Sequence, residues 1–236
     1  MEPQIPVPLR LKFAGYSVHA LTASGAVLGF LALLAAIDHR FVEMFIWLGI
    51  ALFVDGIDGT FARRANVKET AIAISGDTLD LVVDYVTYVL VPALAMFQAG
   101  LFPLGWGTVA AGAICLTAAL YFADVRMKTD DWYFRGFPAV WNLFAFFAFL
   151  LKPEPWITFG LVILFSGLTF APIAFVHPMR VVRLKLLTLL MLGAGTVLAV
   201  AALFWNLDPP GPVVLGLLVV GAYFLLFGLF RPKSQD

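Results

Sequence analysis

The sequence predicts an all-α membrane protein, a helical bundle of about eight transmembrane helices with both ends of the chain in the cytoplasm. Of its 236 residues, 62% are hydrophobic and only 13% are charged. Soluble globular proteins carry about 25% charged residues, so this composition indicates a chain that lies mostly in lipid. Long apolar runs and a one-sided placement of the basic residues are the other two observations.

The apolar runs have the length that a membrane requires. A transmembrane helix needs about 20 mostly apolar residues. The sequence contains eight such runs, at roughly 15–37, 41–62, 75–98, 102–123, 136–151, 155–176, 184–205 and 211–230. Proline and glycine mark turns between them, as in FQAGLFPLG, KPEPW and LDPPGP. We expect a single membrane domain over 1–236, with a core of about 12–176 and two further C-terminal spans over about 184–230.

The basic residues predict the orientation. With eight spans both termini lie on one side, and only Arg40 and Lys152 fall on the other. The residues on the first side are Arg10, Lys12, Arg63, Arg64, Lys68, Arg126, Lys128, Arg135, Arg180, Arg183, Lys185, Arg231 and Lys233. Because cytoplasmic loops are enriched in Lys and Arg, this side is the cytoplasm. We therefore expect a multi-pass membrane protein whose termini and aspartate-rich turn face the cytoplasm. The formal net charge is zero, and we expect no nucleic-acid partner.

Four aspartates stand out against this apolar background. Asp55 and Asp58 are three residues apart near the cytoplasmic end of the second run. Asp80 and Asp84 are four apart in the first turns of the third. Each pair shares a helix face. If the two helices are neighbours, as their short connection indicates, the four carboxylates converge.

Such a cluster needs cations. A charged side chain near the bilayer centre costs about 2.5–3.5 kcal/mol on insertion scales, and nearby like charges repel. Carboxylate oxygens suit Mg²⁺ and Mn²⁺, and two such ions ~3.5–4 Å apart are a common arrangement for phosphoryl displacement. No cysteine or histidine joins the cluster, so we expect two divalent ions, Mn²⁺ or Mg²⁺, and no structural zinc.

The connecting segment is suited to a phosphate ligand. Gly59 leaves room for close approach, and Arg63 offers a planar fork for a diphosphate. Ser75 is placed to cap the third span, with Gly76 at its start. Asp77 is a fifth carboxylate, which we interpret as structural because an acid in a first helical turn is favoured by the helix dipole.

These residues resemble the defining motif of the CDP-alcohol phosphotransferase superfamily. All eight motif positions are filled: Asp55, Asp58, Gly59, Ala62, Arg63, Gly76, Asp80 and Asp84. Twelve residues separate Arg63 from Gly76, where most members have eight or nine. That longer gap, the chain length, the eight spans and the segments YSVHALTASGA and FRGFPAVWN are similar to those of the bacterial phosphatidylcholine synthases.

The resemblance implies a reaction. Members transfer a phosphatidyl group from CDP-diacylglycerol to an alcohol and release CMP, with two divalent ions. By this resemblance Asp55, Asp58, Asp80 and Asp84 hold the metals, and Asp84 is also the base for the acceptor hydroxyl. CDP-diacylglycerol would be bound by Gly59, Ala62, Arg63, Gly76, Thr22 and His19. For His19, a hydrogen bond between helices is the alternative. Family members commonly form homodimers, and the resemblance to the bacterial branch implies a protein of a bacterial inner membrane.

Choline is the acceptor that the resemblance implies. A quaternary ammonium group cannot donate hydrogen bonds, so aromatic faces are expected to recognise it. Tyr85, Tyr88, Trp132 and Trp141 are the candidates, although aromatic residues at a membrane interface are often anchors.

Three alternatives remain open: the same chemistry with serine or another alcohol acceptor, a cation-coupled transporter, and an inactive scaffold. Serine as acceptor would need a partner for its carboxylate, which Arg126 or Arg135 could supply. A cation-coupled transporter would need carboxylates at mid-bilayer and access from both faces. An inactive scaffold is the remaining possibility, and the complete motif argues against it.

Overall fold

The computed structural model describes residues 8–126, 133–176 and 184–227, and most of these residues are helical. The helices are α1 (Leu9–Ile37), α2 (Phe41–Arg64), α3 (Val67–Thr70), α4 (Gly76–Asp84), the π-helix η1 (Tyr85–Leu90), α5 (Val91–Gln98), α6 (Gly107–Ala123), α7 (Trp141–Leu151), α8 (Pro155–Leu168), α9 (Lys185–Phe204) and α10 (Gly211–Leu226). Two short strands, β1 (Tyr133–Arg135) and β2 (Ala174–Val176), pair antiparallel. The predicted all-α membrane bundle is confirmed, with this small ribbon as the departure from it.

Several helices have the length and composition to cross a membrane. Three helical segments of the described chain are both long and apolar enough, over Leu9–Ile37, Gly76–Gln98 and Lys185–Phe204. Helices α6, α7, α8 and α10 are shorter but also apolar. Helix α2 has 24 residues and carries two aspartates and two arginines in its C-terminal half. The exact count of eight spans stays a prediction.

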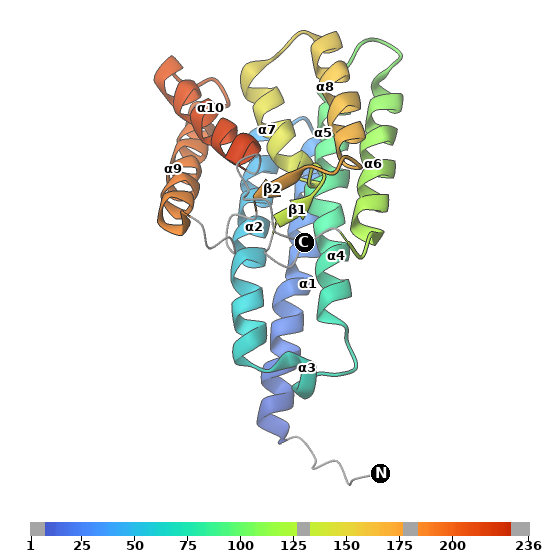
Figure 1. Cartoon of the computed structure of the whole chain (residues 1–236), viewed down its shortest axis with the longest axis vertical. Coiled ribbons are helices and arrows are strands. Elements are labelled where there is room, and N and C mark those ends of the chain that lie inside the picture. The colour runs from blue at the N-terminus through green and yellow to red at the C-terminus, as the bar shows by residue number, and fades with distance from the viewer. Residues whose placement is uncertain (1–7, 127–132, 177–183, 228–236) are drawn as a thin grey trace. The chain divides into compact units, whose positions relative to one another are not determined.

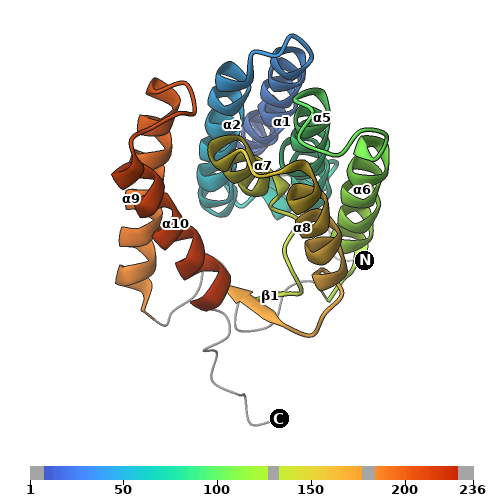
Figure 2. The ribbon, with the colours of Figure 1, turned by 90° about the horizontal axis from the view of Figure 1, so that it is seen from above.

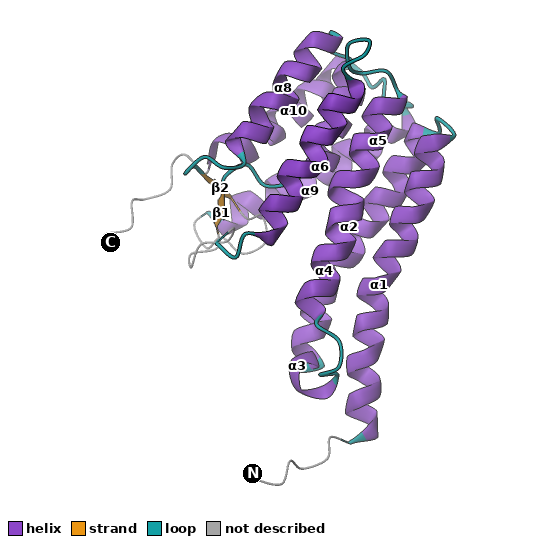
Figure 3. Cartoon of the chain, turned by 90° about the vertical axis from the view of Figure 1, so that its right-hand side faces the viewer, coloured by secondary structure: helices purple, strands orange, loops and turns teal. Residues whose placement is uncertain are grey.

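The fifth and sixth apolar runs are less helical than predicted. Helix α7 begins only at Trp141. At the start of the predicted run, Gly136 is not helical, because its φ is +76° and a Cβ there would lie 1.9 Å from the carbonyl oxygen of Thr169. Helix α8 ends at Leu168, shortly before Pro172, which disfavours helical geometry in the residue that precedes it. The segments beyond these two helix ends form β1 and β2 (Figure 3).

The chain divides into two compact units, Met1–Val91 and Pro92–Asp236, so the expected single domain stays a prediction. In the first unit α1 packs against α2 and also against α4 and η1 (Figure 1). The short α3 lies where α2 ends and α4 begins, and it contacts the N-terminal part of α1. This arrangement brings the ends of α2 and α4 that carry the aspartates to the same end of the unit.

Small residues let α1 approach its neighbours. A Cβ on Gly25 would lie 2.6 Å from Val83 Cγ1, and a Cβ on Gly29 would lie 2.8 Å from Val86 Cγ1. These distances are shorter than normal carbon contacts, so neither position accepts a side chain without a shift. Close packing at small residues is a usual way for membrane helices to associate.

In the second unit, α6 packs against α8, and α9 packs against α10 (Figure 2). A glycine in each of α9 and α10 faces an aliphatic side chain of the other helix, since a Cβ on Gly195 would lie 2.9 Å from Val220. A hydrogen bond of 2.7 Å between the hydroxyls of Thr188 and Tyr223 also joins this pair. Polar contacts of this kind stabilise helix pairs in lipid.

Candidate metal centre

The turn between α2 and α4 is built from residues that favour its geometry. Asn66 adopts the left-handed conformation with φ of 51°, which asparagine tolerates better than most residues, and its amide donates to Glu69 at 2.7 Å. Ser75 caps α4, because its hydroxyl accepts a hydrogen bond from the Thr78 backbone N–H at 3.2 Å. The Ser75 cap therefore fixes the residue at which α4 begins, and with it the position of Asp80 one turn further on.

Three carboxylates from two helices gather in the first unit. Asp55 of α2 and Asp80 and Asp84 of α4 each place one carboxylate oxygen within 4.8 Å of the others. All three side chains are half-buried. The convergence expected from the spacing of the sequence therefore occurs for these three residues.

Asp58 is oriented differently. It is buried, and its Oδ2 accepts a hydrogen bond of 2.6 Å from the hydroxyl of Thr22 on α1. It does not belong to the group of three, yet it lines the same narrow space as Asp55 and Asp80. Asp58 is thus adjacent to the cluster, with one of its oxygens directed to α1.

Asp55 also accepts a hydrogen bond from a hydroxyl, which here belongs to η1. The hydroxyl of Tyr88 in η1 donates to Asp55 Oδ2 at 2.7 Å. Asp55 and Asp58, the two aspartates of α2, therefore each accept a hydrogen bond from a hydroxyl of a neighbouring segment.

Asp77 lies apart from this arrangement. Its carboxylate is exposed and forms an ion pair of 3.4 Å with Lys68. This position agrees with the structural interpretation of Asp77.

The space between the aspartates is about the size of one water molecule. The residues that line this space are Thr22, Gly25, Ala51, Val54, Asp55, Asp58, Asp80 and Val83. Opposite ligands of Mg²⁺ lie about 4.2 Å apart, twice the ~2.1 Å bond length. The oxygens of the three-residue group therefore fit a hard divalent cation after small side-chain adjustments, and the donor set contains only oxygen. An acidic group that can hold a metal is thus present, as predicted.

Comparison with known proteins identifies the family. The chain is 50% identical to the phosphatidylcholine synthase of Rhizobium meliloti (strain 1021) over 214 residues, which cover 90% of this chain and 88% of the relative. It is 38% identical to the phosphatidylcholine synthase of Pseudomonas aeruginosa over 227 residues, or 95% and 94% of the two chains.

The chain belongs to the phosphatidylcholine synthase family. The same name is carried by a relative from Brucella melitensis, which is 45% identical over 90% of this chain and 77% of its own length. No family model matches the chain. The resemblance to bacterial phosphatidylcholine synthases inferred from the motif is therefore confirmed by whole-chain similarity.

His19 and Gly76, which are both expected to bind the donor lipid, lie next to each other. His19 of α1 is buried against the first residue of α4, since a Cβ on Gly76 would lie 3.3 Å from His19 Cε1. Among the described residues His19 Nε2 has no hydrogen-bond partner. The alternative of an interhelical hydrogen bond through Nε2 is thus not realised within the described chain.

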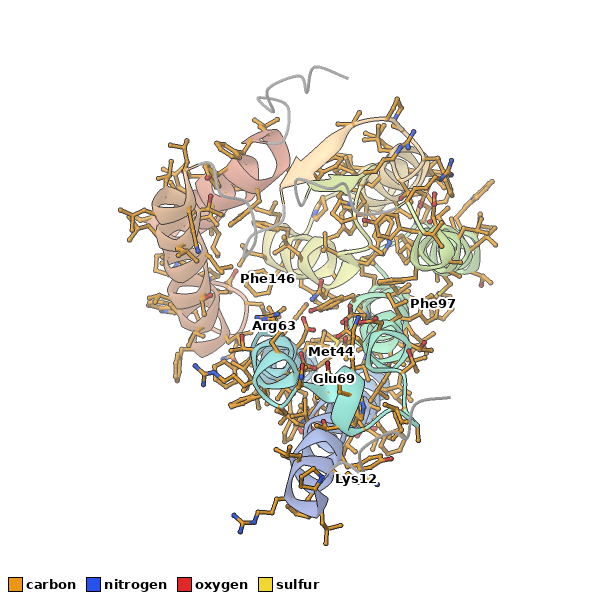
Figure 4. All side chains as sticks on the ribbon, turned by 60° about the horizontal axis from the view of Figure 1, so that its bottom comes forward. Lys12, Met44, Arg63, Glu69, Phe97 and Phe146 are labelled. Carbon is orange, nitrogen blue, oxygen red and sulfur yellow. The ribbon has the colours of Figure 1, made fainter. Side chains whose placement is uncertain are left out.

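The motif residues at the end of α2 lie near one another. Arg63 is exposed and donates to the Thr60 hydroxyl at 3.1 Å, and its Nη1 is 3.5 Å from where a Cβ on Gly59 would lie. Ala62 is half-buried beside the small core of Val18, Val67 and Ala71. Figure 4 views this end of the first unit, with Lys12 on α1, Arg63 on α2 and Glu69 on α3.

The predicted choline-binding aromatics have different surroundings. Tyr85 follows Asp84 directly, Tyr88 lies four residues after Asp84, and both are half-buried. Trp141 is fully buried in the second unit, where its ring contacts Phe137 and Phe144 at centroid distances of 5.6 and 5.5 Å. Trp132 lies outside the described residues.

The hydroxyl partners of Asp55 and Asp58 are not among the residues predicted from the sequence in that role. The resemblance implies that Thr22 binds the donor lipid, Tyr88 is a candidate for binding choline, and in the structure each also donates to an aspartate of α2. Helical spacing relates residues within one helix, and these bonds join different segments. No signal in a single sequence could have identified them.

Proposed function

We propose that this chain transfers the phosphatidyl group of CDP-diacylglycerol to choline and releases CMP. The observation that carries this function is the gathering of Asp55, Asp80 and Asp84 in a chain of the phosphatidylcholine synthase family. Carboxylate oxygens suit Mg²⁺ or Mn²⁺, and these ions in turn bind the phosphate oxygens of a diphosphate substrate. The apolar helices would let the acyl chains of that substrate stay in lipid.

The reaction requires one bond to form and one to break. The hydroxyl oxygen of choline attacks the phosphorus that bears diacylglycerol, and the bond from this phosphorus to the oxygen of CMP breaks. The hydroxyl proton passes to the carboxylate of Asp84, and CMP leaves with the electron pair. Asp84 suits this role because it lies in the aspartate group, and a carboxylate that reaches the acceptor hydroxyl can act as a general base.

The four motif aspartates would hold two divalent ions. Asp55, Asp80 and Asp84 supply one group of ligands, and Asp58 lies at the same space. Bound Mn²⁺ or Mg²⁺ would neutralise charge on the phosphoryl oxygens. Arg63 is exposed at the end of α2 and would meet the diphosphate, while Gly59 and Gly76 leave room for the nucleotide.

Two observations favour choline over serine. Tyr85 follows the proposed base directly and Tyr88 lies one helical turn beyond it, and aromatic rings are the groups that recognise a quaternary ammonium ion. Arg126, one of the two arginines that could hold the carboxylate of serine, is already engaged. It forms two hydrogen bonds of 2.9 Å with the two oxygens of Asp124, a bidentate ion pair.

We place the site at the cytoplasmic face of a bacterial inner membrane. In the first unit, Arg63, Arg64 and Lys68 lie at the aspartate end, and Arg40 lies at the opposite end, where it pairs with Asp38. A cysteine in place of Lys68 in a Cys115→Ala background should resist a membrane-impermeant maleimide in intact spheroplasts, whereas one in place of Asp38 should react. The reverse pattern would contradict this orientation.

CMP release by purified protein in vesicles tests the reaction. The vesicles contain CDP-diacylglycerol and Mn²⁺, and the acceptor is choline, serine or none. We expect choline-dependent release that stops with EDTA, returns with Mn²⁺ and is absent in Asp84→Asn. Release with serine alone would keep the chemistry and replace the acceptor. No release from folded protein with any acceptor would favour a transporter or an inactive scaffold.

The expected homodimer stays a prediction. Light scattering of the purified protein, corrected for detergent, distinguishes one chain of 25.8 kDa from two.

A further inference from the structure

The hydroxyl of Tyr88 contacts a predicted metal ligand, Asp55, at 2.7 Å. This length is typical of a strong hydrogen bond from a hydroxyl to a carboxylate, where the hydroxyl donates. One oxygen of Asp55 is therefore tied to η1, and the plane of the carboxylate is restrained. Such partners orient metal ligands and raise metal affinity.

Tyr88 is itself held by its surroundings. It lies in the π-helix η1, an arrangement that is rare and often found at functional sites. The α1 glycine Gly29 allows this segment to approach closely, because a Cβ on Gly29 would lie 2.8 Å from Val86 and 3.2 Å from Thr87. The hydroxyl of Thr87 bonds back to the Val83 carbonyl oxygen at 3.0 Å. The backbone that carries Tyr88 is thus packed on α1.

We propose that Tyr88 is a positioning residue that sets the affinity of the site for a divalent cation through Asp55. This inference rests on the proposed function, because it requires Asp55 to bind the metal. It gives the phenol hydroxyl a role separate from the choline contact proposed for the ring.

The test measures Mn²⁺ binding by electron paramagnetic resonance on the full chain in detergent, without donor lipid or choline. Tyr88→Phe removes the hydroxyl and keeps the ring. Tyr223→Phe is the matched control, because it also removes a hydroxyl that forms a 2.7 Å hydrogen bond between elements, here with Thr188. Melting temperatures of both variants show whether they are folded.

We expect Tyr88→Phe to weaken Mn²⁺ binding about tenfold, and Tyr223→Phe to change it less than about twofold. Para-aminophenylalanine at position 88 restores a donor and should restore binding to within about threefold of wild type. If Tyr88→Phe does not fold, para-fluorophenylalanine at position 88 supplies a variant of nearly the same shape that cannot donate. In the transfer reaction, the Mn²⁺ concentration for half-maximal rate should rise while the KM for choline stays unchanged.

Three results would overturn the inference. Equal Mn²⁺ binding by wild type and Tyr88→Phe removes the positioning role while the metal site stands. Unchanged Mn²⁺ binding with a raised KM for choline assigns the hydroxyl to the acceptor. Wild-type protein that binds no Mn²⁺ overturns the proposed metal site as well, so the two failures are distinguishable.

Discussion

Gly25 on α1 faces Val83 on α4 so closely that a Cβ on Gly25 would lie 2.6 Å from Val83 Cγ1. Asp84 follows Val83 directly, and Gly25 and Val83 both line the space between the aspartates. The packing of α1 on α4 therefore determines where the carboxylates of α4 lie.

Gly25→Val should consequently reduce both stability and activity. Overpacking of this kind costs typically 1–3 kcal/mol, because the β-branched Val83 cannot easily move aside. Gly49→Val is the control, since no atom lies within 4 Å of a Cβ on Gly49. Melting temperature and choline-dependent CMP release should fall in Gly25→Val only. Recovery in the double variant Gly25→Val with Val83→Ala would support the contact, and equal behaviour of Gly25→Val and Gly49→Val would contradict it.

Thr22→Val should destabilise the protein through Asp58. The buried carboxylate would lose its 2.6 Å hydrogen bond, and a buried acceptor left without its donor costs about 1–3 kcal/mol. Thr22→Ser retains a hydroxyl and should keep most of the stability and activity. Thermal unfolding and CMP release measured for both variants check this expectation. A Thr22→Val protein that matches Thr22→Ser in both measurements would show that the bond to Asp58 contributes little.

Arg63 and Arg64 should differ in their effect on the donor lipid. Both are exposed at the end of α2, and only Arg63 belongs to the motif. A hydrogen bond to a charged group contributes about 1.5–3 kcal/mol, so Arg63→Gln should lower kcat/KM for CDP-diacylglycerol about tenfold or more. Arg64→Gln should lower it less than about threefold, as expected for a basic residue that anchors a span. Similar losses in the two variants would place the diphosphate elsewhere.

The ion pair of Asp124 and Arg126 should be visible in a pH titration. Hydrogen bonds from Arg126 lower the pKa of Asp124 from the usual 3.8 to about 2. Because the folded-state pKa is the lower one, the pair stabilises the fold above about pH 4, and this contribution is lost as pH falls through about 2. The carboxyl ¹³C shift of Asp124 should titrate near 2 in the intact protein. In Arg126→Gln the midpoint should return toward 3.8, and an unchanged midpoint would contradict the pairing.

The helical regions could be predicted well wherever an apolar run was long and uninterrupted. The runs at 41–62 and 75–98 match α2 and the continuous helix through α5 within a few residues. The predicted helices at 136–151 and 155–176 are longer than α7 and α8. Composition could not reveal that Gly136 packs against the Thr169 carbonyl, because that contact joins distant parts of the chain.

The site shows the same limit. Residue spacing placed Asp55, Asp80 and Asp84 on faces that could meet, and the structure brings these three together. The orientation of Asp58 toward Thr22 depends instead on the packing of α1 against α2. The bond from Tyr88 depends on a π-helix, which has no simple sequence pattern. Tertiary packing decides these details.

The most direct test of the proposed transfer is the fate of radiolabelled choline in vesicles that contain the protein, CDP-diacylglycerol and Mn²⁺. We expect the label to enter phosphatidylcholine, with one CMP released for each lipid formed. Asp84→Asn should form no labelled lipid, while Arg64→Gln should remain active. CMP release without labelled lipid, or labelled lipid formed equally by Asp84→Asn, would contradict the proposed transfer at the aspartate cluster.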